Sequence, residues 1–415
     1  MLLAIGASLL VAPATASAVN TVGFSSVGNM TTPRDFPGAA SLPDGRVLVV
    51  GGGLTTFTDP QTSAEIFDPK TNTFSAAGVG SMAVPRYGPA TAALPDGRIL
   101  VAGGYNGSDD VSSAEVFNPT SGNFSQVGSM SAAREGAATA LLPDGRLLIA
   151  GGAGNSSDSL DSSEIFDPKT NTFSPGPNLP VGVDAPASAP ISDGRTLIAG
   201  GYTTDYSTGA LIFTPLSTFA STGSLAVPSY GPAGAALPQG RALVAGGFDG
   251  DNYSDNAEIF DPQTGAFSSV GVGKLLNAFE EATGAALPDG RALVAGGFDE
   301  TGALATAEVL SVPSNSFATK LKGRKVKFSV TTEGVGQVMD VSTKVATTAK
   351  KKKKKPKLVK TTSKHGGPGT IVVKIKLTKQ GSAKLRQKGK LKVRVSYTPD
   401  GGLATTKKLK LRAGK

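Results

Sequence analysis

A unit of about 50 residues recurs six times along this 415-residue chain and limits the folds open to it more than any other feature. An Asp-Gly-Arg step marks each copy, beginning at Asp44, Asp96, Asp144, Asp193 and Asp289, with Gln239 in place of Asp once. Successive steps lie 52, 48, 49, 46 and 50 residues apart. A unit that repeats at this period is one supersecondary element, and neighbouring copies must stack to bury their apolar faces.

The second copy shows how each unit is built. Pro95-Asp96-Gly97 favours a tight turn, because Pro fixes φ, Asp bonds its own backbone and Gly accepts positive φ. The apolar run Ile99–Ala102 follows, and Gly103-Gly104 ends it. An Ala-rich segment before the turn and two short segments after the diglycine complete the unit. Each copy therefore predicts four short antiparallel strands.

These residues resemble the kelch repeat in type and order. Gly103-Gly104 stands where that family has its diglycine, and Glu115–Pro119 matches its Glu-x-aromatic-Asp-Pro step. Phe124 takes the place of a later aromatic residue that is usually Trp. This chain has no Trp and places Phe there in every copy, at Phe74, Phe124, Phe173, Phe219, Phe267 and Phe317. The resemblance covers residues 19–319 and implies an all-β fold, a six-bladed kelch-type β-propeller similar to the central domain of galactose oxidase.

Two segments compete to complete the sixth blade. Thr21–Met30 is similar to Gly122–Met130, so it predicts an outer strand without a blade of its own. Propellers remove an exposed strand edge by closing the ring with one terminus, which would set Phe24 beside the sixth blade. Alternatively, Ser314–Ala318 closes that blade and the N-terminal strand is an added layer.

The first 18 residues predict a signal peptide. The apolar run Leu2–Ala12 is too short to span a bilayer, and Ala16-Ser17-Ala18 has the small-x-small form of a cleavage site. A buried strand and a misplaced start codon are the alternatives. The absence of Cys fits export without disulfides and leaves no thiol nucleophile or thiolate metal ligand. We therefore expect a secreted protein, extracellular or associated with the cell envelope, with no transmembrane span.

Charge divides the chain sharply after residue 319. Residues 1–319 carry 12 basic and 29 acidic side chains, whereas residues 320–415 carry 29 basic and 3 acidic ones. Within this basic tail, segments such as Ile371–Leu377 and Leu391–Tyr397 alternate apolar residues with Lys or Arg, as half-buried strands do. The pattern predicts a small Ig-like β-sandwich and resembles the Lys-rich modules that end many exported actinobacterial proteins.

The tail also contains a lysine block. Lys350–Lys355 are six consecutive lysines, followed by Pro356 and Lys357, and such a block repels itself and stays solvated. A plain solvated loop is one interpretation, and attraction to anionic envelope polymers or glycans is another. No aromatic residues interleave with the lysines, so no nucleic-acid partner is expected. Docking between the acidic propeller and the basic tail is a third possibility.

The two faces of the expected propeller differ in character. Antiparallel strands place the Asp-Gly-Arg and Asp-Pro turns on one face, hereafter the turn face. The loops after each diglycine and the connections between blades fall on the other, the loop face, where variable loops favour recognition. Twelve residues before the arginine of the Asp-Gly-Arg step, the first three blades have Arg34, Arg86 and Arg134. These arginines either pack inside the blades or make one side of the channel mouth cationic, suited to carboxylates or sulfates.

Aromatic and acidic residues accompany them on the loop face. Tyr87, Tyr105, Tyr202 and Tyr230 are placed to stack on sugar rings. Asp249, Asp251 and Asp255 alternate along one loop, a spacing that hard cations use, although the glycine and distal Glu of an EF-hand are missing. A solvated loop is the alternative to a Ca²⁺ site, and no other cofactor is expected.

These features favour a non-catalytic binding protein. Galactose-oxidase chemistry needs a Tyr–Cys crosslink and two His ligands, whereas this chain has no Cys and a single His, His365 in the tail. The leading hypothesis is an exported propeller that binds a glycan or a protein and is held at the envelope by its basic tail. The alternative is a mutarotase- or epimerase-type propeller enzyme acting on an acidic sugar, with Glu135 and Glu280 as candidates for proton transfer.

Overall fold

The computed structural model describes residues 23–55, 59–156, 158–214 and 218–311, together with the backbone of strands between residues 316 and 412. Val22–Val312 form one compact unit, and the strands from Ser316 onward belong to a second. The predicted signal peptide and the lysine block lie outside the described residues. Within the described part, no helix is long and apolar enough to cross a membrane.

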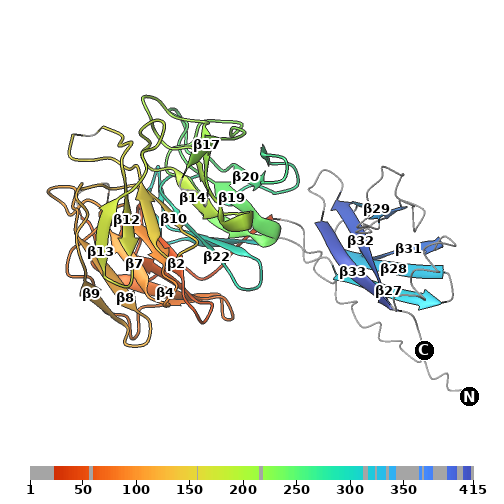
Figure 1. The fold of residues 1–415 in the computed structure, drawn as a ribbon. Helices are drawn as coiled ribbons and strands as arrows, with labels where there is room; N and C mark the ends of the chain where they lie inside the picture. The colour runs from red at the N-terminus through yellow and green to blue at the C-terminus, as the bar shows by residue number, and fades with distance from the viewer. Residues whose placement is uncertain are drawn as a thin grey trace, which may run out of the picture. The chain divides into compact units, whose positions relative to one another are not determined.

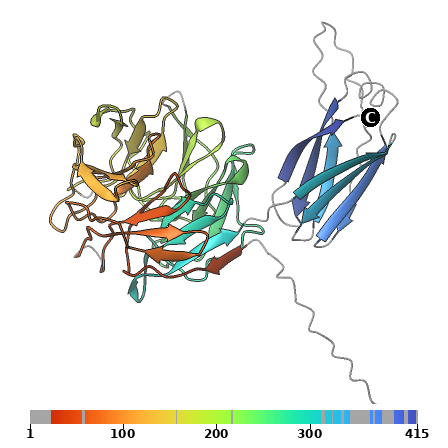
Figure 2. The ribbon, with the colours of Figure 1, turned by 90° about the horizontal axis from the view of Figure 1, so that it is seen from below.

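The first unit is a six-bladed β-propeller of four-stranded antiparallel sheets, as the repeat predicts (Figures 1 and 2). The first strands of neighbouring blades contact one another around the ring, which closes between β2 and β22. The first strand of each blade lies nearest the axis. In blade order these innermost strands are β2 (Gly38–Ser41), β6 (Ala90–Ala93), β10 (Ala138–Leu141), β14 (Ala187–Pro190), β18 (Ala233–Leu237) and β22 (Thr283–Ala286). The second strands are β3 (Val47–Val50), β7 (Ile99–Ala102), β11 (Leu147–Ala150), β15 (Thr196–Ala199), β19 (Arg241–Ala245) and β23 (Ala292–Ala295).

The outer half of each blade follows the same plan. The third strands are β4 (Ala64–Asp68), β8 (Ala114–Asn118), β12 (Ser163–Asp167), β16 (Ala210–Phe213), β20 (Ala257–Asp261) and β26 (Ala307–Ser311). The fourth strands are β5 (Thr73–Ser75), β9 (Asn123–Gln126), β13 (Thr172–Pro175), β17 (Phe219–Ser221), β21 (Ala266–Ser268) and β1 (Gly23–Ser26). The short elements are the 3-10 turns η1 (Ser192–Gly194) and η2 (Pro238–Gly240) and the hairpin β24 (Phe298–Asp299) with β25 (Gly302–Ala303).

The N-terminal strand closes the ring. β1 pairs antiparallel with β26, with Phe24 opposite Leu310 and Ser25 opposite Val309. Phe317 instead lies in β27 (Ser316–Lys322), which pairs with β28 (Lys325–Thr332). The structure therefore selects the first of the two closures that the sequence left open, and β1 covers an edge that β26 would otherwise expose.

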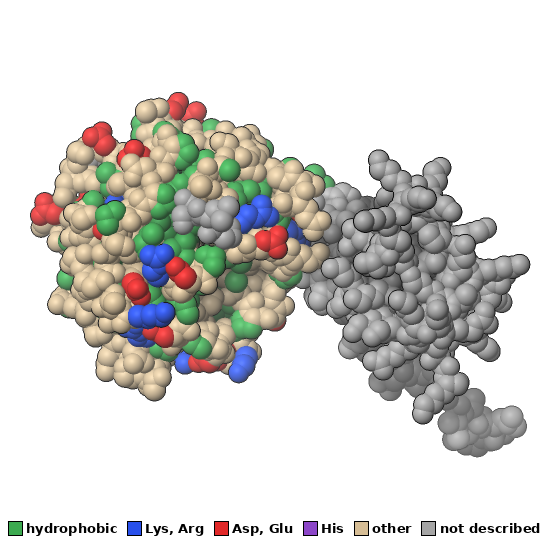
Figure 3. Space-filling view, viewed as in Figure 1, with side chains coloured by type: hydrophobic (Ala, Val, Ile, Leu, Met, Phe, Trp, Pro, Cys, Tyr) green, Lys and Arg blue, Asp and Glu red, His purple; other side chains and the backbone are tan. Residues whose placement is uncertain are grey.

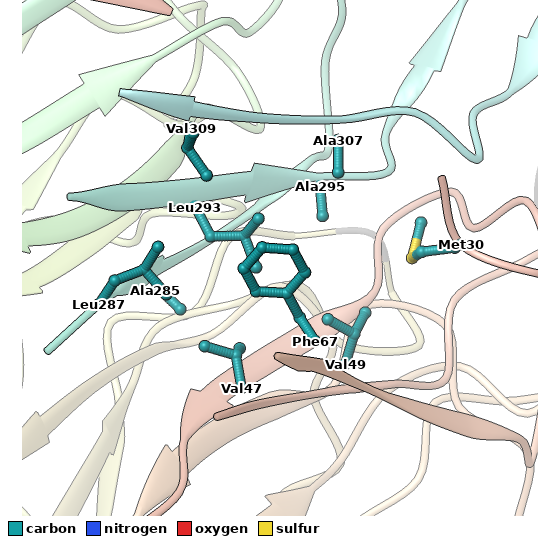
Figure 4. Packing of buried hydrophobic residues seen from close by; sticks show 10 residues of the cluster. All are labelled: Met30, Val47, Val49, Phe67, Ala285, Leu287, Leu293, Ala295, Ala307 and Val309. Carbon is teal, nitrogen blue, oxygen red and sulfur yellow. The ribbon is translucent and has the colours of Figure 1, made fainter. Parts of the chain in front are cut away.

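Apolar side chains from neighbouring sheets interlock between the blades. Phe67 of β4 is fully buried and packs into the sixth blade against Leu293 and Val309 (Figure 4). Its ring also lies 4.9 Å, centroid to centroid, from that of Phe74 in β5. Phe117, Phe166, Phe213 and Phe260 repeat this arrangement in the next four blades. A phenylalanine pair thus fills this space in each of the first five blades, and Phe24 opposite Leu310 takes its place in the sixth.

Arginines on the turn face join neighbouring blades. In blade 2, Arg98 holds Asp96 of its own turn and also donates to the carbonyl of Pro168 at 2.7 Å in blade 3. Arg291 reaches the carbonyl of Pro69 in the same way, across the junction of blades 6 and 1. Acidic and basic side chains lie next to one another over the propeller in Figure 3. These arginines serve as clamps between neighbouring blades.

The tail contains two antiparallel sheets. One has the order β27-β28-β31 (Gly369–Lys376), and the other has the order β30 (Lys364–Gly366), β29 (Gly336–Ser342), β32 (Lys390–Pro399), β33 (Thr405–Arg412). The alternating segments of the sequence therefore do form strands. Their assembly into an Ig-like sandwich stays a prediction.

Candidate functional site

The three arginines singled out from the sequence are buried inside the blades. Arg34 and Arg86 have no exposed surface, and Arg134 is 1% exposed. Arg86 donates from Nη1 to the carbonyls of Gly103 at 2.7 Å and Ser113 at 2.8 Å, and from Nη2 to Glu115 at 3.2 Å. The prediction of a cationic channel mouth is therefore wrong: these guanidiniums bind the chain itself, as the packing interpretation holds.

The same contacts explain why the diglycine recurs at this point of the blades. The carbonyl of the first glycine accepts from the arginine, and a β-carbon on Gly103 would lie 2.2 Å from the backbone oxygen of Arg134. Burial lowers the pKa of Arg86, and the facing Glu115 carboxylate opposes that shift. In the fifth blade, Ser229 makes the equivalent bond to the carbonyl of Gly246 at 2.7 Å. The arginine position is thus a device for holding the loop against the sheet.

We call the site held by Arg34, Arg86 and Arg134, and its equivalent in the other three blades, the arginine position. The residue immediately after it reaches the channel mouth. Each such residue pairs through its backbone with the residue that follows the diglycine of the same blade. We call these six positions the carboxyl–tyrosine ring, and in blade order they are Asp35, Tyr87, Glu135, Asp184, Tyr230 and Glu280. The order Asp-Tyr-Glu occurs twice, so a rotation by three blades maps the ring onto itself.

The next residue of every blade has left-handed backbone, which turns the chain into the innermost strand. Gly88, Gly136 and Gly231 meet this need without strain, whereas Phe36, Ala185 and Glu281 do so with φ of 49°, 48° and 56°. These residues are linked from blade to blade by backbone hydrogen bonds, such as Gly136 N to Gly88 O at 2.9 Å. The linked backbone forms the rim of the channel.

One carboxyl cluster lies where blades 6, 1 and 2 meet. The Tyr87 hydroxyl forms hydrogen bonds with Asp35 Oδ2 at 3.1 Å and with Glu281 Oε2. Burial raises the pKa of Asp35 to about 6, and burial together with Asp35 raises the pKa of Glu281 well above its usual range. Burial and the charge of Asp35 raise the pKa of Glu280 to about 7. We call Asp35, Glu280 and Glu281 the first cluster.

A second cluster occupies the opposite side of the ring. Burial, with the charges of Asp110 and Asp184, raises the pKa of Glu135 to about 8. Burial raises the pKa of Asp184 to about 7, although Tyr230 donates to its Oδ2 at 3.3 Å. Burial and Asp109 raise the pKa of Asp110 to about 6. Glu135, Asp184 and Asp110 form the second cluster, and such shifts gather at functional sites.

An aromatic row continues from the second cluster across the loop face. The ring of Tyr206 contacts those of Tyr202, Tyr230 and Phe248 at centroid distances of 5.4, 6.3 and 5.6 Å. Tyr253 extends the row to Phe298 at 6.3 Å. We use aromatic row for Tyr202, Tyr206, Phe248, Tyr253 and Phe298.

The four tyrosines predicted to bind a ligand have different environments. Tyr87 is buried in the first cluster, and Tyr230 lies against the second. Tyr105 is half-buried and pairs with Tyr87 through its backbone. Tyr202 is 37% exposed and is the member of this set that faces solvent most openly.

The Asp249 loop does not gather metal ligands. Asp249 accepts from the backbone nitrogens of Asp251 at 2.9 Å and Asn252 at 2.7 Å, and Asp255 pairs with Lys274 at 2.6 Å. Among the described residues, no three His, Cys, Asp or Glu side chains are grouped to hold a metal ion. Asp249 therefore stabilises its own loop, and Asp255 links the loop to Lys274.

The channel beneath the rim is a cavity of about 330 Å³ lined by the innermost strands. Its wall consists mainly of Ala, Gly and Pro, with hydroxyls from Thr91, Thr139 and Ser188 among others. Phe36 lies at the loop-face end, where its ring packs edge-on against Tyr87 at 5.4 Å. The chemically varied groups are therefore at the rim and not along the channel.

Sequence reasoning named Glu135 and Glu280 but missed Asp35, Asp184 and Glu281. The sequence contains a signal for this ring. One residue follows the arginine position in every blade, and in blade order these six residues are Asp, Tyr, Glu, Asp, Tyr and Glu. Side chains that recur at one register of a propeller meet around its axis, whatever their separation along the chain.

Comparison with known proteins agrees with this architecture. Kelch motifs match residues 86–131, 136–180 and 230–271. The chain is thus a six-bladed propeller that carries kelch motifs. A stretch of 104 residues is 34% identical to spermatocyte protein spe-26 of Caenorhabditis elegans, covering 24% of this chain and 18% of that protein. A solved structure of YjhT superposes with a TM-score of 0.57 at 15% identity, covering 69% of this chain and 97% of the other, and so shows the fold alone.

Proposed function

We propose that this chain is a protein-binding propeller and that its loop face is the binding surface. The observation that carries the proposal is the carboxyl–tyrosine ring, which is continuous with the aromatic row through the Tyr206–Tyr230 contact. Tyrosine is enriched in protein interfaces and their hot spots, since it combines apolar area with a hydrogen-bonding hydroxyl. On the turn face, by contrast, Arg98 and Arg291 join neighbouring blades.

Site-specific crosslinking tests this assignment. A photoreactive amino acid at Tyr202 on the loop face should capture a discrete partner in the native cell, whereas the same group at Asp144 on the turn face should not. Both positions are exposed, at 37% for Tyr202 and 53% for the Asp144 side chain. Equal capture from the two faces, or capture from Asp144 alone, would rule out the loop face as the binding surface.

Export and attachment through the basic tail complete the proposal. Ala16-Ser17-Ala18 supports secretion, and the excess of 29 basic over 3 acidic side chains in residues 320–415 supports attraction to anionic envelope polymers. Such attraction is screened by salt. High-salt washing should then release the protein from cells, and a chain ending at residue 312 should appear free in the medium. Retention of that shorter chain on cells would contradict attachment through the tail.

A glycan ligand and an enzymatic role are the alternatives. Tyr202 and the row beside it are also suited to stacking on a sugar ring. Glu135 and Glu280, with pKa values of about 8 and about 7, favour proton transfer near neutral pH. Arg86 and Arg134 are buried and so do not reach an acidic sugar on the loop face. Glycan-array binding, or turnover of a reducing sugar that is lost in E135Q and E280Q, would favour these alternatives over a protein partner.

A further inference from the structure

Three carboxyl oxygens of the carboxyl–tyrosine ring are buried without a hydrogen-bond partner. They are Asp35 Oδ1, Glu135 Oε2 and Asp184 Oδ1. Buried polar atoms are nearly always bonded, so each exception requires an explanation. Asp35 is completely buried and lies beside Glu281, whereas the other two oxygens belong to neighbouring blades of the second cluster.

The pseudo-symmetry of the ring shows what distinguishes the two clusters. Rotation by three blades superposes Asp35 on Asp184, Tyr87 on Tyr230 and Glu280 on Glu135. The same rotation places Glu281, whose carboxyl group contacts Tyr87 and Asp35, on Gly136. The first cluster therefore contains a side chain at a point where the second has none.

The unpartnered oxygen of Asp184 lies over Gly136. A β-carbon built on Gly136 would be 2.4 Å from Asp184 Oδ1, and the ring of Phe36 would be 3.3 Å from it. Oδ1 thus points toward the channel rim, while Oδ2 of the same carboxyl group faces Tyr230. Glu135, in the preceding blade, lies close enough for the charge of Asp184 to raise its pKa, and it has its own unpartnered oxygen.

The chemistry of this set selects a cationic donor. In their ionised forms Glu135 and Asp184 only accept hydrogen bonds, so a ligand that binds those forms must supply donors to both oxygens. No Lys or Arg of the described chain forms an ion pair with Glu135 or Asp184. No group of three metal-binding side chains occurs among those residues either. An organic cation fits these requirements better than a metal ion.

We infer that the second cluster receives an arginine side chain of the protein partner, with its guanidinium between Glu135 and Asp184. A guanidinium presents parallel donors to two oxygens in one plane, and its faces stack on aromatic rings. Tyr230 and Tyr206 lie beside the cluster for such stacking. This inference rests on the proposed function and names the chemical group that the loop face recognises.

Peptide binding to the full chain tests it directly. The probe is the peptide Gly-Gly-Arg-Gly-Gly, titrated at pH 8 and followed by NMR line broadening, with the same peptide carrying citrulline as its uncharged isostere. We expect a dissociation constant on the order of 1 mM for the arginine peptide. Citrulline should weaken binding at least about 10-fold, and a lysine peptide should fall between them.

Three variants separate a specific site from general charge attraction. E135Q and D184N should each weaken binding about 10-fold or more, whereas D158N, which removes an exposed aspartate from the loop after the third diglycine, should leave it unchanged. G136E, patterned on Glu281, adds a negative charge but fills the site, so it should abolish binding. Glu281 accepts the same left-handed backbone, and a circular-dichroism spectrum checks that each variant is folded.

Several results would overturn the inference. They are equal binding of the arginine and citrulline peptides, binding that E135Q and D184N leave unchanged, stronger binding by G136E, and preference for free spermidine over the arginine peptide. The last result would assign the cluster to a small polyamine. The crosslinking at Tyr202 does not depend on Glu135 or Asp184. Capture of a partner there would therefore support the proposed function even if the peptide fails to bind.

Discussion

Arg86 donates to Glu115 at 3.2 Å, with both side chains completely or almost completely buried. The pair joins the connection between blades 1 and 2 to strand β8. Glu115 also accepts from the backbone nitrogens of Ala83 at 2.8 Å and Val84 at 3.2 Å. One carboxylate therefore holds the whole connection between blades 1 and 2 in place. The connection in turn fixes the position of the loop-face residues that follow it.

Removing Arg86 should destabilise the propeller strongly. The variant R86A leaves Glu115 buried without its cation, and breaking such a pair costs about 3–5 kcal/mol. R46A provides the matched control, because Arg46 pairs with Asp44 at an exposed turn where ion pairs contribute about 0–1 kcal/mol. Urea unfolding followed by circular dichroism measures both. If R86A were as stable as R46A and instead lost ligand binding, the structural role of Arg86 would be disproved.

The contrast between fold and site shows what a sequence can and cannot specify. Six registered copies of turn, apolar run and diglycine determine the blades, because each signal acts locally. The sequence could not decide which segment closes the ring, because Thr21–Met30 and Ser314–Ala318 both carry the outer-strand pattern. Only the pairing with β26 distinguishes them. The direction of the Arg86 side chain was equally undetermined, since its acceptors are carbonyls whose position depends on the folded diglycine loop.

The diglycine loops offer a test of close backbone approach. Gly103 and Gly78 have similar φ, 69° and 76°, so alanine strains both by about 1–2 kcal/mol. A β-carbon at Gly103 would also collide with the Arg134 carbonyl at 2.2 Å, whereas a β-carbon at Gly78 would meet nothing within 4 Å. G103A should therefore lower the free energy of unfolding by at least about 3 kcal/mol, well beyond G78A. Equal effects in urea unfolding would show that the loop adjusts freely.

Closure by β1 predicts a defined requirement for the N-terminal strand. A chain starting at residue 28 lacks β1 and exposes the edge of β26, which is a template for pairing with other chains. A chain starting at residue 21 keeps the strand and is the control. The shorter chain should melt at a lower temperature and form oligomers on size-exclusion chromatography. A monomer with an unchanged melting temperature would indicate that another segment completes the sixth blade.

The carboxyl clusters predict that stability falls as pH rises. Burial raises the pKa values of Asp35, Asp184 and Glu135 to about 6, 7 and 8, so the folded state binds protons that the unfolded state has already released. Their stabilisation is complete below about pH 4 and is lost between pH 4 and 8, at about 1.4 kcal/mol per pH unit for each extra proton bound. E135Q cannot titrate, so its stability should fall less steeply than that of the wild type up to pH 8. The turn-face carboxyls Asp44 and Asp96 have lowered pKa values, so they change the stability only at pH values below this range. Urea midpoints at half-unit intervals would measure the slope, and a midpoint that rises from pH 5 to 8 would show that these carboxyls are ionised in the folded protein.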